Sequence, residues 1–138
     1  MERIIKSLVV FVILSLICLP AQVSAEEPLF EPVPQVKKEL PHTDFSACIK
    51  TFPLTVEKLY YLTLAATNEY NYEIRELQSK SGYIIFETGY RKFLASIIYV
   101  SANKSMLKIT PYSGNYDFSP EIPKKVFTYI ETYQNEKY

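Results

Sequence analysis

The chain has 138 residues, a length that allows one domain with a tail. Its 15 basic and 15 acidic side chains cancel. The chain therefore lacks the excess of positive charge that is typical of nucleic-acid-binding proteins. One histidine and two cysteines cannot fill a structural zinc site, and the three glycines are isolated, so no metal ion, phosphate-binding loop or other cofactor is expected.

Residues 1–25 have the pattern of a cleavable secretory signal peptide. Arg3 and Lys6 precede an apolar run over residues 8–19, and small residues lead up to Ala25. A run of about 12 residues is too short to cross a bilayer core of ~30 Å as a helix. We therefore expect cleavage after Ala25, export to the periplasm or the medium, and no membrane span after cleavage. An uncleaved membrane anchor is the alternative.

Cleavage would leave 13 basic and 14 acidic side chains and a single cysteine, Cys48. Cys18 lies inside the apolar run and follows Ile17, whereas a lipidation site needs a small residue before its cysteine, so no lipid anchor is expected. Cys48 has apolar neighbours, which favours burial as a small hydrophobic side chain over reactivity. A disulfide between two chains is the alternative for an exported lone thiol.

Residues 26–44 predict a proline-rich tether in front of a single domain over residues 45–138. The tether contains Pro28, Pro32, Pro34 and Pro41. Proline fixes φ and donates no backbone hydrogen bond, so this composition favours an extended, solvated backbone.

Hydrophobic periodicity in the domain predicts alternating strands and helices in a definite order. The predicted elements are a strand over 46–52, a helix over 55–69, a strand over 72–77, a hairpin over 82–100, a strand over 105–110, and a helix entered at 119–123. Thr55 is expected to cap the first helix. Consecutive strands with short turns predict an α+β fold, an antiparallel sheet of four to five strands with both helices packed on one face.

The layout from the first helix to the last resembles small exported bacterial domains of the helix-grip kind, which include those of the BamC envelope lipoprotein. The matching pieces are the helix over 55–69, the segments 72–74 and 81–86, and the closing helix. The likeness lies in this pattern alone, with no diagnostic motif. It implies a non-catalytic role in the cell envelope and carries over no functional residue.

The central hairpin carries apolar side chains on both faces of the sheet. One set is expected to contact the helices: Ile84, Phe86, Phe93, Ala95 and Ile97. Alternation then turns a second set away from the helices: Tyr83, Ile85, Leu94 and Ile98. Because contiguous exposed apolar patches mark interaction sites, these four residues are predicted to bind a protein partner or a second copy. Cover by the tether or the first strand is the alternative.

No catalytic residue is predicted. His42, the single histidine, lies in the tether, and a nucleophilic pair of Cys48 and His42 oriented by Asp44 would lie where nothing excludes water. Glu73 and Glu87 could act as acid and base across a pocket. Their alternation with apolar neighbours instead predicts solvent-facing positions on strands.

Tyrosine is abundant, with 12 residues in the chain, and suits partly exposed interfaces. We therefore expect an exported, non-catalytic binding or assembly module of the bacterial cell envelope that uses an apolar, tyrosine-rich sheet face. The alternative is a carrier that holds a small apolar ligand between sheet and helix, lined by Tyr60, Tyr70 and Phe86.

Overall fold

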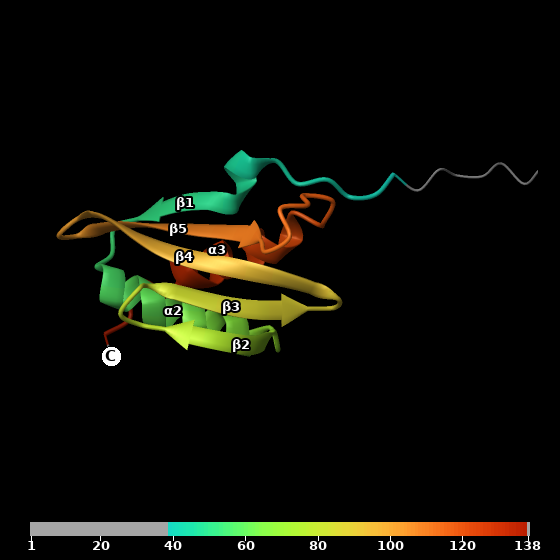
Figure 1. Ribbon diagram of the computed structural model, residues 1–138. Helices are drawn as coiled ribbons and strands as arrows, with labels where there is room; N and C mark the ends of the chain where they lie inside the picture. The colour runs from blue at the N-terminus through green and yellow to red at the C-terminus, as the bar shows by residue number, and fades with distance from the viewer. Residues whose placement is uncertain (1–38, 138) are drawn as a thin grey trace, which may run out of the picture. The chain divides into compact units, whose positions relative to one another are not determined.

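The computed structural model describes residues 39–137 of the chain (Figure 1). The predicted signal peptide and residues 26–38 of the predicted tether lie outside this part. The first elements are the 3-10 helix η1 (Phe45–Cys48), strand β1 (Ile49–Phe52) and helix α2 (Val56–Glu69). Then come strands β2 (Glu73–Gln78), β3 (Tyr83–Thr88), β4 (Arg91–Ser101) and β5 (Lys104–Pro111), and helix α3 (Glu121–Tyr133).

The five strands form one antiparallel sheet in the order β1-β5-β4-β3-β2. Both helices lie behind this sheet in Figure 1, where α2 packs against the strands and against α3. The predicted α+β class and the order strand, helix, four strands, helix are confirmed. We call the side of the sheet that the helices cover the inner face, and the opposite side the outer face.

Helix α2 begins and ends where its sequence predicts. The Thr55 hydroxyl oxygen accepts a hydrogen bond from the Lys58 N–H at 3.2 Å, which satisfies one of the free donors of the first turn. The chain leaves the helix through Asn71, which adopts a positive φ of 54°, a conformation that asparagine tolerates better than most residues. These two polar residues therefore set the length of the element.

The predicted first strand is wrong over its first half, where η1 replaces it. The Ala47 N–H donates to the Asp44 carbonyl, and only residues 49–52 pair with β5. Thr43 fixes the start of this turn, because its N–H donates to the Tyr116 carbonyl and its hydroxyl donates to the Phe118 carbonyl at 2.6 Å. Anchoring by a segment more than 70 residues away overrides the local strand preference.

The core lies between the inner face and the helices. All five residues predicted to face the helices are buried, as are Val126, Phe127 and Ile130 of α3. Aromatic rings run through this layer: Tyr72 stacks on Phe86 with 5.2 Å between ring centroids, and Phe86 stacks on Phe93 at 5.5 Å. Alternation along β3 and β4 therefore directs one complete set of side chains into the core.

Candidate functional site

The four residues predicted to face away from the helices do share the outer face. The strand register pairs Ile85 with Leu94 and Tyr83 with Ser96, and it pairs Ile98 with Met106 of β5. The sequence prediction missed Met106, although its alternation with the buried Leu107 was a usable signal. We call Ile85, Leu94, Ile98 and Met106 the apolar strip.

The exposure of the apolar strip is uneven. Ile98 keeps 40% of its surface exposed and Ile85 only 9%, while Leu94 and Met106 are half-buried. Ser96 separates Leu94 from Ile98 along β4, and it pairs with Lys108 of β5. The outer face is therefore a mixed surface, in which a polar row interrupts the apolar side chains.

Strand β1 does not cover the apolar strip. It extends the sheet beside β5, with Ile49 opposite Lys108 and Thr51 opposite Met106. The predicted alternative in which the first strand folds over this face is therefore wrong. The tether is the other predicted cover of this face, and its residues 26–38 lie outside the described residues.

Tyr83 is held at the border of the outer face by a hydrogen bond. Its hydroxyl donates to the Glu76 carboxylate at 2.7 Å, and this bond raises the pKa of Tyr83 above its usual value, with smaller contributions from burial and from the charge of Glu76. The phenol therefore stays protonated, and its ring is fixed beside Ile85.

A charged cluster forms the border at the other end of β3. Arg75 contacts Glu73 at 2.8 Å and Glu87 at 2.7 Å, and Lys92 lies 3.7 Å from Glu87. The hydrogen bond from Arg75 lowers the pKa of Glu87 below its usual value. Glu73 and Glu87 are cross-strand neighbours joined by one guanidinium, so the cluster keeps Glu87 ionised, whereas a general acid needs a raised pKa.

The two edges of the sheet are poorly suited to bind a further strand. The β1 edge is only four residues long, and β2 carries charged side chains and a register shift between Ile74 and Glu76. Short, bulged or charged edges resist strand addition. The outer face is therefore better suited to docking than either edge.

Cys48 and His42 do not form a nucleophilic pair. Cys48 is fully buried, burial raises the pKa of its thiol, and its Sγ donates to the Asp44 carbonyl at 3.7 Å. His42 Nδ1 instead lies 3.2 Å from the Asp117 carboxylate. The predicted role of Cys48 as a small buried side chain is confirmed.

The three residues predicted to line a ligand cavity pack against neighbouring side chains. Phe86 is fully buried between Tyr72 and Phe93, and Tyr60 is 6% exposed. The Tyr70 ring meets the Tyr129 ring at 6.4 Å between centroids. A ligand at this place would have to displace packed aromatic rings.

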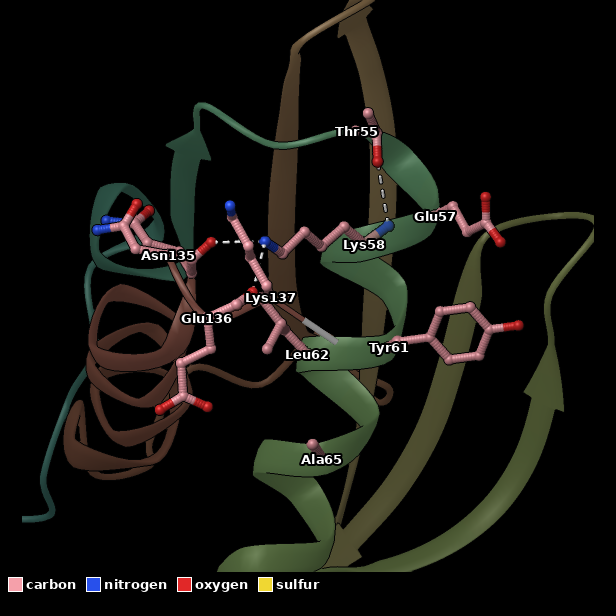
Figure 2. Close-up of a pocket in the computed structure, with 10 residues that line it drawn as sticks. Thr55, Glu57, Lys58, Tyr61, Leu62, Ala65, Asn135, Glu136 and Lys137 are labelled. Carbon is pink, nitrogen blue, oxygen red and sulfur yellow. Dashed lines mark hydrogen bonds between the residues drawn. The ribbon is translucent and has the colours of Figure 1, made fainter.

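A hollow of about 940 Å³ lies between α2 and residues 134–137 (Figure 2). Lys58 reaches across it, and its Nζ donates to the carbonyls of Gln134 at 2.7 Å and Glu136 at 3.2 Å. Figure 2 shows Tyr61 pointing away from the terminal segment. The ammonium group of Lys58 therefore serves the fold, because it binds the free carbonyls after α3.

Within residues 39–137, no group of three or more histidine, cysteine, aspartate or glutamate side chains is placed to hold a metal ion. In the same part of the chain, no helix is both long and apolar enough to span a membrane. The chain matches no protein-family model and no curated protein. The function proposed below therefore rests on geometry and chemistry.

Proposed function

We propose that this chain is an exported, non-catalytic binding or assembly module of the bacterial cell envelope, and that it docks a partner protein on its outer face. The observation that carries the proposal is the apolar strip, which lies on the face that neither helix covers. The signal-like residues 1–25 support the exported location.

The surroundings of the apolar strip favour a protein as the occupant. Apolar side chains at the centre and polar side chains at the border are the usual anatomy of a protein interface. Charges of both signs lie around and across the apolar strip, with Glu76 at one end of β3, Glu87 and Lys92 together at the other end, and Lys108 in the polar row. A partner with charges of both signs would complement these charges.

The test uses a double variant, Leu94→Lys with Ile98→Lys, in the full chain as cells produce it. Both positions are partly exposed, and the lysine stem can lie along the sheet, so we expect a loss of stability of at most about 2 kcal/mol. A photo-crosslinking residue at Tyr83 should form a covalent adduct of defined mass, which the double variant should reduce by at least about tenfold.

The matched control places the same two charges on the exposed side of α3, with Thr128→Lys and Thr132→Lys. It should leave the adduct unchanged. A loss of folding in the Leu94 and Ile98 variant would show that this face is core, and equal adducts in both variants would show that docking occurs elsewhere. An adduct with twice the mass of the chain would identify a second copy as the occupant in place of a different protein.

A further inference from the structure

A second hollow, of about 510 Å³, lies at the end of the sheet where the β3–β4 turn meets the segment that leaves β5. Its lining combines two tyrosines with two cations and two small side chains: Tyr90, Arg91, Lys92, Pro111, Tyr112 and Ser113. A volume of this order is within the usual range of about 300–1,000 Å³ for small-ligand sites.

Backbone pairing brings these residues together. Gly89, with a φ of 61°, occupies the first position of the two-residue turn, and this turn leaves the Tyr90 side chain fully exposed. Pro111 is opposite Phe93, and the Tyr112 N–H donates to the Lys92 carbonyl at 2.8 Å. Paired strands therefore fix the backbone of Lys92 and Tyr112, whereas the Tyr90 ring extends freely from the turn beside them.

The cations at this hollow have spare hydrogen-bonding capacity. Lys92 Nζ lies 5.4 Å from the centroid of the Tyr112 ring and 3.7 Å from Glu87, which is already bound by Arg75. Arg91 Nη1 lies 3.5 Å from the Asn115 carbonyl, at the limit of a hydrogen bond. A guanidinium has five donors, so most of those of Arg91 are available to an anion.

The lining of the hollow contains two cations, Arg91 and Lys92, and no carboxylate. Lys92 lies 3.7 Å from Glu87, whereas Arg91 forms no ion pair within residues 39–137. The Tyr112 side chain is 60% exposed and the Tyr90 side chain is fully exposed, so two aromatic surfaces lie beside these cations. An anionic group and a ring would each find a complementary surface here.

We propose that this hollow binds a saccharide that carries an anionic group, either a carboxylate or a phosphate. The C–H face of the sugar ring would stack on Tyr112 or Tyr90, and Arg91 and Lys92 would bind the anionic group. The Ser113 hydroxyl oxygen accepts a hydrogen bond from the Asn115 N–H at 3.4 Å, and its proton would be donated to a sugar hydroxyl. Lys92 lies both at the border of the outer face and in this hollow, so the two sites adjoin, but none of the four residues of the apolar strip lines the hollow.

The test adds four probes, one at a time, to the full chain as cells produce it. Nuclear magnetic resonance records the shifts of the protein's resonances at each concentration. The galacturonic acid trimer and glucose 1-phosphate represent the two sources of negative charge, and maltotriose and inorganic phosphate represent the ring alone and the anion alone. At least one acidic sugar should shift the resonances of the six lining residues and bind at least about tenfold more tightly than both controls. Which acidic sugar binds identifies the anionic group.

Substitutions then test the assigned roles. Arg91→Gln and Tyr112→Ala should each weaken binding about tenfold, and Tyr112→Phe should retain most of it because the ring remains. Matched controls outside the hollow, Lys108→Gln and Tyr99→Ala, should leave binding unchanged.

Several results would overturn the proposal. These are no binding of either acidic sugar, equal binding of maltotriose or inorganic phosphate, or equal losses in the control variants. If Tyr112→Ala failed to fold, Arg91→Gln and Tyr112→Phe would still test the proposal. Equal affinity of these two variants and the unchanged chain for the acidic sugar would contradict the role assigned to Arg91.

Discussion

At the scale of single residues, Gly82 shows how one backbone position holds the central hairpin in place. Its φ is 68°, and its carbonyl accepts a hydrogen bond from the Ile97 N–H at 2.7 Å. A Cβ atom at this position would lie 3.0 Å from the Ile97 carbonyl oxygen. Glycine is therefore needed for two reasons, the left-handed backbone and the close approach of β4.

We predict that Gly82→Ala lowers the free energy of unfolding by about 2–4 kcal/mol, through the left-handed conformation and the contact with backbone. Gly89→Ala is the matched control, because Gly89 has a similar φ of 61° but no atom within 4 Å of the added Cβ. Its loss should be only about 1–2 kcal/mol. Urea unfolding of both variants measures the difference, and equal losses would show that the Ile97 contact has no cost.

At the scale of elements, the sequence predicted the features that depend on neighbouring residues in the chain, namely the ends of helices and the alternation of side chains along strands. Thr55 and Asn71 mark the ends of α2, and the alternation along β3 and β4 identified the inner set of side chains. The replacement of the first strand's start by η1 could not be predicted this way. It depends on the hydrogen bonds of Thr43 to residues 116 and 118, which a local pattern does not contain.

The contact between α2 and the end of α3 is another long-range feature. Lys58 lies in the first turn of α2, and its Nζ bonds to carbonyls 76 and 78 residues further along the chain. Positive charge is favourable at a helix C-terminus, where carbonyls lack partners within the helix. We call these two hydrogen bonds of Lys58 the clamp, because they connect α2 to the end of α3.

We predict that Lys58→Met, which keeps the apolar stem and removes the donor, lowers the free energy of unfolding by about 1–2 kcal/mol. Amide hydrogen exchange should also become faster in the last turn of α3. The control is Lys124→Met, which removes only an exposed contact with Glu121 at 3.1 Å and should cost less than about 0.5 kcal/mol. Equal effects of the two variants would indicate that the clamp contributes no stability.

At the scale of the whole molecule, the sequence predicted the layers and the antiparallel pairing of the four consecutive strands β2 to β5, but not the place of β1 in the sheet. Apolar side chains on both faces of the hairpin followed from alternation, and so did the four outer residues. The place of β1 beside β5 depends on the path of the chain across the sheet, as does the pairing of Met106 with Ile98. The polar row of Ser96 and Lys108 became visible only with the register.

The same register joins three strands electrostatically, which links the stability of the sheet to pH. Arg75 of β2 and Lys92 of β4 both contact Glu87 of β3, and the hydrogen bond from Arg75 lowers the pKa of Glu87 in the folded state. A lowered pKa means that the folded state binds this proton less readily than the unfolded chain does. The stabilisation is therefore fully present above the ordinary glutamate pKa of about 4.3 and is lost as the pH falls through the lower folded value.

We predict that Arg75→Gln raises the pKa of Glu87 toward its ordinary value and narrows the difference in stability between about pH 7 and about pH 3. Carbon-13 titration of the Glu87 carboxyl group measures the first effect, and urea unfolding at both pH values measures the second. Lys80→Gln removes the same charge from an exposed turn residue that forms no ion pair within residues 39–137, so it should change neither quantity. An unchanged pKa of Glu87 in Arg75→Gln would show that the guanidinium does not hold the three strands together through this carboxylate.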